Sequence, residues 1–114
     1  MKLPASFDDG RVRFDPDFAD RLVGKVVLIG VTHEDFRGNV KAQEQFFGTV
    51  KTVDPKFGIT IELGGERAGR TYRLPPSTES FKPAPKGEYR LRSTGEVLID
   101  PDFTTEWRQV QRDA

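Results

Sequence analysis

The sequence predicts a mainly β fold, a small closed barrel with a short N-terminal helix and an additional C-terminal hairpin. Short runs of β-branched and aromatic residues recur from residue 25 onward, and turn signals of Gly, Pro and Asp separate them at short intervals. Helical spacing occurs in one segment, before residue 25. The 114 residues suffice for one domain with one core. This combination is typical of small barrels and sandwiches.

Composition narrows the class of protein. The chain holds 18 Lys and Arg against 18 Asp and Glu, so its formal charge is zero, and it has no Cys. Disulfide frameworks, thiolate metal sites and Cys nucleophiles are thereby excluded, and a nucleic-acid partner is disfavoured because it needs a basic field. No apolar run reaches the ~20 residues of a membrane helix, and the N-terminus has no secretory apolar core. We expect a single cytoplasmic domain over residues 1–114, with residues 1–13 loosely ordered and no membrane contact.

A helix is predicted to begin at Asp15. Asp15 can cap the first turn, and Pro16 suits the first helical position. Phe18 and Leu22 share one face, to which Val23 can also belong, and Gly24 ends the helix.

The next segments are expected to be strands. Residues 25–31 form a β-branched run, and residues 46–53 form a second strand. The polar residues 32–45 between them predict a long loop or a distorted strand. Asp54-Pro55-Lys56 predicts a turn. In the strand 57–63 the odd-numbered residues, Phe57 to Leu63, should face the core.

The second half of the chain is expected to form hairpins. The glycine-rich residues 64–69 predict a hairpin connection rather than a phosphate loop, because no Lys-Ser or Lys-Thr follows and no helix does either. Residues 71–74 return as a strand with Tyr72 and Leu74 inward. The four prolines of residues 75–87 exclude a central strand. Residues 88–92 and 96–99 pair across the turn 93–95, and residues 104–110 form the last strand.

Residues 46–63 resemble the first motif of Sm-like proteins. That motif places a Gly, a hydrophobic strand, an Asp, a short turn and a strand ending in Leu in the order that Gly48, Asp54, Ile59 and Leu63 follow here. The resemblance implies a strongly bent SH3/Sm-like barrel after an N-terminal helix. In the family the Asp and an Asn four residues later help to hold an RNA base. Asp54 matches the first, Gly58 replaces the second, and the Arg-Gly pair of the family's second motif is absent.

A second resemblance covers the C-terminal part of the chain. Residues 87–97, the Asp-Pro-Asp-Phe segment at 100–103 and Trp107 look like the C-terminal part of small bacterial proteins. No activity follows from this likeness.

Candidate sites for metal ions and catalysis are few. His33, Glu34 and Asp35 cluster, but adjacent residues point in different directions, whereas a metal needs converging ligands. As a general base His33 would also need a nucleophile, and no sequence pattern supplies one. The Asp-Pro-Asp segments 15–17 and 100–102 offer oxygen ligands for Mg²⁺, but cap and turn chemistry explains them without a metal, and we favour it. We predict no metal, no cofactor, no catalytic residue and no enzyme activity.

Two sets of residues are candidates for binding a partner. Arg90 and Arg92 should share the outer face of one strand, with Arg73 on that of another, either as a solvated face or as a site for an anionic partner. Phe46 and Phe47 are consecutive, so one must point away from the core, where the helix or the long loop covers it or an interface does.

These patterns favour a non-catalytic binding module that acts through protein–protein contacts, with a partner or with another copy of itself. A bacterial inhibitor or immunity-like protein is a special case of this hypothesis. The candidate residues are Phe36, Phe46, Phe47, Arg73, Arg90 and Arg92. The alternative is an RNA-binding Sm-like protein that uses Asp54, Gly58 and Arg73. A third hypothesis is a small enzyme centred on His33.

Overall fold

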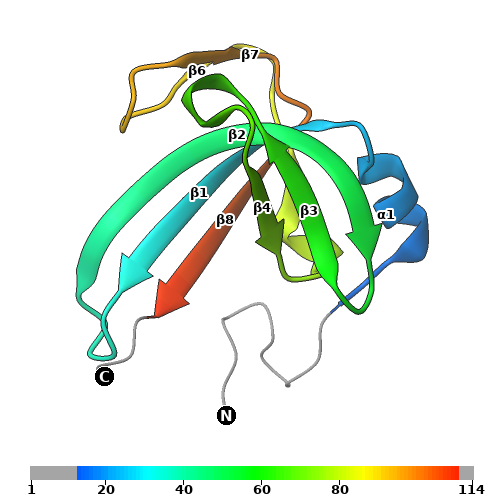
Figure 1. Ribbon diagram of the computed structural model, residues 1–114, viewed down its shortest axis with the longest axis horizontal. Coiled ribbons are helices and arrows are strands. Elements are labelled where there is room, and N and C mark those ends of the chain that lie inside the picture. Colours follow the sequence, from blue (N-terminus) through cyan, green and yellow to red (C-terminus); the bar gives the residue numbers. More distant parts are fainter. Residues whose placement is uncertain (1–12, 111–114) are drawn as a thin grey trace.

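The computed structural model describes residues 13–110, which form one short helix followed by eight strands (Figure 1). The mainly β class predicted from the sequence is confirmed. The elements, in chain order, are α1 Pro16–Leu22, β1 Val26–Glu34, β2 Val40–Asp54, β3 Gly58–Leu63, β4 Thr71–Leu74, β5 Phe81–Pro83, β6 Glu88–Arg90, β7 Val97–Ile99 and β8 Phe103–Val110, with 3-10 turns η2 at Gly65–Arg67 and η3 at Thr78–Ser80.

The capped helix is confirmed. The Asp15 carboxylate accepts hydrogen bonds from the amides of Asp17 and Phe18, at 3.0 and 3.3 Å, and Pro16 occupies the first turn. Leu22 is fully buried, whereas Val23 follows the helix and is exposed, so it does not belong to the apolar face. Of residues 1–13, expected to be loosely ordered, only Arg13 lies within the described part, and its carbonyl accepts a hydrogen bond from the Thr78 amide.

A long hairpin replaces the loop expected over residues 32–45. β1 continues to Glu34 and β2 begins at Val40, with one register shift beside Glu34. Of the two predictions for this segment, the distorted strand is therefore closer to the structure than the long loop. The Asp35 carboxylate closes the turn by accepting the amides of Arg37 and Asn39, both at 2.9 Å. Most of residues 36–43 are exposed, so the segment lacks the apolar alternation by which a half-buried strand is recognised.

The turn at Asp54 is confirmed, but the strand after it begins one residue later than expected. Asp54 accepts the amides of Lys56 and Phe57, at 2.7 and 2.8 Å, which keeps Phe57 in the turn and exposed. Ile59, Ile61 and Leu63 face the core as predicted.

One curved sheet holds six strands in the order β4-β3-β2-β1-β8-β5. All its neighbours are antiparallel except β1 and β8, which run parallel (Figure 1). β4 and β5 are the two ends of this order, and within residues 13–110 no strand pairing joins them into a closed barrel. The short β5 confirms that the proline-rich residues 75–87 supply no central strand. No helix in the described range has the length and apolar character of a membrane span.

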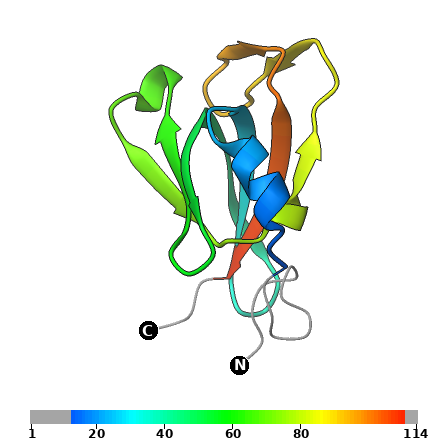
Figure 2. The same cartoon turned by 90° about the vertical axis from the view of Figure 1, so that its right-hand side faces the viewer.

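Helix α1 lies across the opening between the two ends of the sheet (Figure 2). Phe18 packs edge-on against Phe103 of β8, with ring centroids 5.5 Å apart, and Leu22 joins the core. The buried core is otherwise made by the inward residues of the sheet, namely Val27, Ile29, Val31, Phe46, Val50, Ile59, Ile61, Leu63, Leu74 and Phe81.

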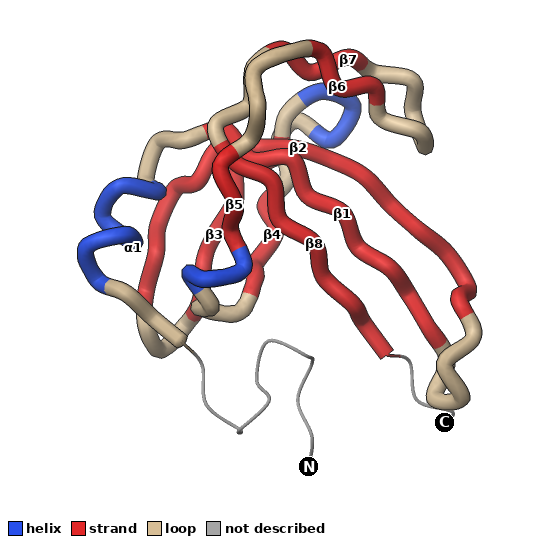
Figure 3. Tube along the Cα trace, turned by 180° about the vertical axis from the view of Figure 1, so that it is seen from behind, coloured by secondary structure: helices blue, strands red, loops and turns tan. Residues whose placement is uncertain are grey.

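The predicted additional hairpin is present as a separate two-stranded sheet. β6 and β7 pair antiparallel and lie beyond the convex side of the six-stranded sheet (Figures 1 and 3). Leu91 and Leu98 are its buried anchors. β6 ends at Arg90, so Arg92 lies outside the strand that the sequence assigned to it.

Gly58 is predicted to be essential for stability. Its φ of +104° strains any other residue, and a Cβ there would overlap the carbonyl oxygen of Leu74 on the neighbouring strand. Gly38 has a similar φ of +90°, but no atom lies within 4 Å of where its Cβ would be. A substitution at Gly38 therefore measures the cost of the backbone strain alone, without the steric overlap. We expect Gly38→Ala to cost about 1 kcal/mol and Gly58→Ala roughly 2 kcal/mol more, measured by urea unfolding. Equal losses would contradict the close approach.

Candidate functional site: a three-stranded extension

Three strands continue beyond the core as a three-stranded extension, defined as residues 30–34 of β1, 40–47 of β2 and 106–110 of β8. β3 pairs with β2 only from Gly48 onward, and β5 pairs with β8 only up to Thr105. Among the described residues, the outer sides of β2 and β8 therefore have no neighbouring strand in this region. The extension has two open sheet edges.

The β2 edge presents peptide groups outward. The Phe47 carbonyl accepts a hydrogen bond from the Gly64 amide on the side away from β1, at 3.0 Å. Alternate residues of an antiparallel strand point their peptide groups to the same side, so those of Gln45 and Gln43 also face outward. The Gln45 carbonyl accepts the Ser93 hydroxyl, at 3.3 Å. Gln43 lies beyond this contact, on the uncovered part of the edge.

The far end of the extension carries exposed apolar side chains. Phe36 is 55% exposed, Val40 56% and Val110 53%. Val40 of β2 and Val110 of β8 both pair with Glu34 of β1, from opposite sides, so the three residues form a row across the three strands. We call Phe36, Val40 and Val110 the apolar tip. The Arg37 guanidinium lies 5.3 Å from the centroid of the Phe36 ring.

A half-buried ionic network lies on the inner face of the extension. The two carboxylate oxygens of Glu44 contact His33 Nε2 and Arg67 Nη2, each at 2.6 Å. The Arg67 guanidinium also lies 4.4 Å from the centroid of the Phe46 ring. The hydrogen bonds from Arg67 and His33 lower the pKa of Glu44 below its ordinary value. The network ties the connection between β3 and β4 to β2.

The network borders the core through Tyr72. The Tyr72 ring packs at a steep angle on Phe46, with centroids 5.0 Å apart. Burial, and then the negative charge of Glu44, raise the pKa of its hydroxyl. Sequence reasoning did not single out Glu44, and its only signal was its position two residues before Phe46, on the same face of a strand.

The consecutive phenylalanines separate as predicted, and the outward one is covered. Phe46 is 3% exposed in the core, and Phe47 lies half-buried on the opposite face. A Cβ on Gly64 would lie 2.8 Å from the Phe47 ring, so the connection after β3 covers it rather than the helix or the loop we expected. Of the candidate aromatic residues, Phe36 is the one at the apolar tip.

The arginine candidates do not form one surface. Arg73 lies on the edge strand β4, whereas Arg90 ends β6 in the other sheet and Arg92 follows it. All three are exposed. The Arg92 amide donates to Gln45 Oε1 at 2.7 Å, which fixes its backbone against β2.

The residues of the RNA hypothesis lie together at the turn between β2 and β3. Asp54 pairs with Gly58, and Arg73 Cγ lies 3.4 Å from where a Gly58 Cβ would be. The amides of Phe57 and Lys56 already occupy the Asp54 carboxylate and lower its pKa. Phe57, missed by the sequence analysis, is 65% exposed, with Lys56 Nζ 5.8 Å from its ring centroid.

The side chains considered as metal ligands in the sequence contact separate partners. His33 contacts Glu44, Glu34 Oε2 lies 3.3 Å from Arg108 Nε, and Asp35 closes its own turn. Asp100 accepts the Gly87 amide and Asp102 the Val26 amide, so both carboxylates bond to backbone amides of distant segments rather than within their own turn. Within residues 13–110 no group of three His, Cys, Asp or Glu side chains converges as metal ligands would.

The chain matches no protein-family model, no curated protein and no solved structure. The features that bear on function are therefore those of the extension, namely its open edges and its apolar tip.

The Glu44 network predicts a pH-dependent contribution to stability. Because the folded-state pKa of Glu44 lies below the ordinary 4.5, its contribution is complete above about that pH and is lost as the pH falls through the folded pKa. Glu44→Gln should therefore cost about 1 kcal/mol at pH 7, and progressively less below pH 4.5.

Urea unfolding of both proteins from pH 7 to pH 3 checks this expectation. The control is Glu62→Gln, an exposed carboxylate 4.0 Å from Lys51. A constant difference between Glu44→Gln and the wild type at all pH values would contradict an ionic role for Glu44.

Proposed function

We propose that the chain is a non-catalytic binding module that acts through protein–protein contacts, and that the three-stranded extension is its binding surface. The main observation in support is that one region combines an open backbone edge with an exposed apolar tip. An edge supplies hydrogen bonds to a partner strand, and apolar side chains supply buried area.

The open edge favours an extended peptide segment as the partner element. Unpaired N–H and C=O groups along an edge strand are a template for a further strand. The uncovered part of β2 lies beyond Gln45, around Gln43 and toward the apolar tip. A partner strand added there would also contact Val40.

The apolar tip contributes little to the folded chain itself. Phe36, Val40 and Val110 are each more than half exposed, and none belongs to the core. An exposed cluster of large apolar residues is typical of an interaction site. Phe36, as the aromatic residue, is the expected anchor.

For the fold we propose a small SH3/Sm-like barrel. Helix α1 precedes the first strand, β2 curves strongly, and β2 and β3 form a tight hairpin at Asp54 (Figure 1). These features support the proposal, as does the helix that lies over the opening of the sheet (Figure 2). A bacterial inhibitor or immunity-like protein is the form of binding module that fits a chain of this size.

The test compares the wild type with Phe36→Ser/Val40→Ser as bait in the native host's extract. We expect a specific partner to be enriched by the wild type and at least about tenfold less by the double variant, because the apolar anchor is lost. Val97→Ser/Ile99→Ser is the matched control, since both residues are exposed, at 42% and 57%, and lie on β7 outside the extension. Quantitative mass spectrometry of the captured proteins gives the ratio.

Size-exclusion chromatography with light scattering tests self-association in the same variants. A dimer that is lost in Phe36→Ser/Val40→Ser but kept in Val97→Ser/Ile99→Ser would make a second copy the partner. The proposal would be overturned if the wild type is a monomer and if the wild type, the double variant and the control capture the same proteins.

RNA binding is the second candidate function, and Phe57 is the observation that favours it. An exposed aromatic ring beside Lys56, with Arg73 near the same turn, can stack on a base and contact phosphate. Single-stranded RNA should then bind with an affinity that falls steeply with salt and is reduced by Phe57→Ala. Flat titrations at low salt would eliminate this candidate.

A further inference from the structure

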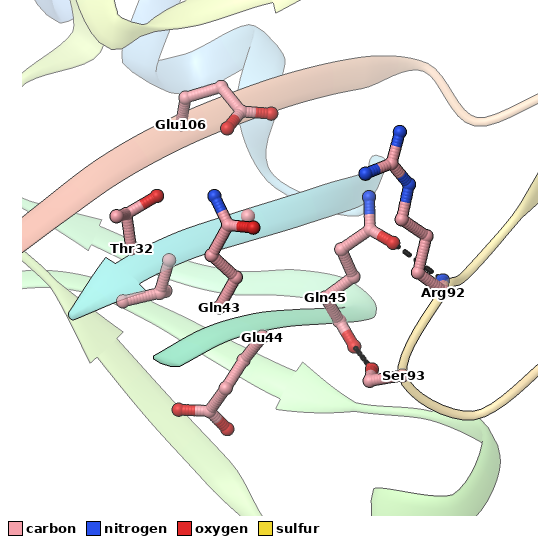
Figure 4. A pocket seen from close by; sticks show the side chains of 9 residues that line it. Thr32, Gln43, Glu44, Gln45, Arg92, Ser93 and Glu106 are labelled. Atoms are coloured by element: carbon pink, nitrogen blue, oxygen red, sulfur yellow. Dashed lines mark hydrogen bonds between the residues drawn. The ribbon is translucent and has the colours of Figure 1, made fainter. Parts of the chain in front are cut away.

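We propose that a cleft on the outer face of the extension binds a small molecule that has a side-chain cation at one end and a carboxylate at the other, as the basic amino acids do. The cleft has a volume of about 300 Å³. It lies between the sheet and the Arg92–Ser93 segment (Figure 4). Small-molecule sites begin near this size.

The floor of the cleft arises from the strand register. Gly30 of β1 pairs with Gln45 of β2 on one side and with Glu106 of β8 on the other. The three residues form a row on one face of the sheet, and the middle one has no side chain. The Glu106 carboxylate lies over the space that Gly30 leaves, since a Cβ there would be 2.8 Å from Oε1. The cleft lies between this carboxylate and Gln45, with Thr32 and Gln43 in the row beside it.

The wall of the cleft is held in place. Gln45 Oε1 accepts the Arg92 amide at 2.7 Å, and the Gln45 carbonyl accepts the Ser93 hydroxyl at 3.3 Å. These bonds fix a segment 47 residues away in the sequence against β2. The cleft thus exists before a ligand arrives, which lowers the entropic cost of binding.

Two opposite charges border the cleft without neutralising each other. Among the described residues neither Glu106 nor Arg92 makes an ion pair, whereas the nearby Arg108 is paired with Glu34 at 3.3 Å. Figure 4 shows the Glu106 carboxylate and the Arg92 guanidinium on different sides of the cleft, with the amides of Gln43 and Gln45 between them. The Glu44 side chain points to the opposite face of the sheet.

This arrangement defines the ligand. A carboxylate on the ligand suits the planar, two-pronged guanidinium of Arg92, and a guanidinium or ammonium group suits Glu106. The Gln43 and Gln45 amides can each donate and accept hydrogen bonds to the polar middle of the molecule. Because the two charged groups lie on different sides of the cleft (Figure 4), a ligand whose cation is several bonds from its carboxylate, such as a basic amino acid, suits it best.

The probe for the test is free L-arginine, added to ¹⁵N-labelled protein and followed by NMR. We expect saturable shifts at Thr32, Gln43, Gln45 and Glu106. Agmatine lacks the carboxylate and pentanoate lacks the cation, so each should bind at least about tenfold more weakly. Equal affinity for arginine and agmatine would overturn the role of Arg92.

Variants separate the site from general charge effects. Glu106→Gln and Arg92→Gln should each weaken arginine binding at least about tenfold. The exposed Glu62→Gln and Arg70→Gln, which lie outside the cleft, should leave it unchanged. Loss of binding in all four, or in none, would overturn the proposal.

Gly30→Thr tests the cleft itself. A Cβ at Gly30 would meet the flexible end of Glu106, with Oε1 at 2.8 Å, so the strand can accept the change while the cleft fills. We expect a folded protein, judged by its unfolding transition, that no longer binds arginine. Unchanged arginine binding in this folded variant would place the ligand elsewhere and overturn the proposal.

Discussion

The close approach of two strands at Gly48 is the constraint on which the rest of the structure depends. Gly48 pairs with Val27 of β1 and with Leu63 of β3, so it is buried between two neighbours. A Cβ there would overlap the Glu62 carbonyl oxygen and lie 2.6 Å from the Ile61 side chain. Only a residue without a side chain lets β3 meet β2 at this point.

This position divides β2 into two parts with different tasks. From Gly48 onward β2 pairs with β3, while its pairing with β1 ends at Thr49, and Val50 belongs to the core. Before it, β2 pairs only with β1 and belongs to the extension. The inner face of that part is braced by the Glu44 network and the outer face carries Gln43 and Gln45. One long strand thus connects the stable core with the surface available to ligands and partners.

The parts of the fold that depend on neighbouring residues were predictable from the sequence. The Asp15 cap, the Asp54 turn and the alternation of Ile59, Ile61 and Leu63 are local, and the structure contains all three. Phe57 was assigned to the core because the alternation was extended one residue too far into a turn. The sequence also left residues 32–45 without a firm assignment, since strands exposed on both faces show no apolar period.

The candidate site was less predictable, because it depends on pairing between distant segments. Phe36 was identified as a candidate, but Val40 and Val110 are brought together only by their common pairing with Glu34 of β1. The row of Gln45, Gly30 and Glu106 likewise requires both the hairpin register and the parallel pairing of β8. Parallel neighbours leave no local signature when the connection between them is long and irregular.

The parallel pairing of β1 and β8 also has a consequence for how the chain acquires its structure. Val27 finds Phe103 only after the whole intervening chain has been synthesised, so one side of β1 stays without its neighbour while the hairpin with β2 can already form. Contacts so distant in sequence make folding slow, and the waiting apolar strand is exposed to aggregation. The polar residues Thr32, Gln43 and Gln45 on the outer face of this hairpin limit that risk during biosynthesis.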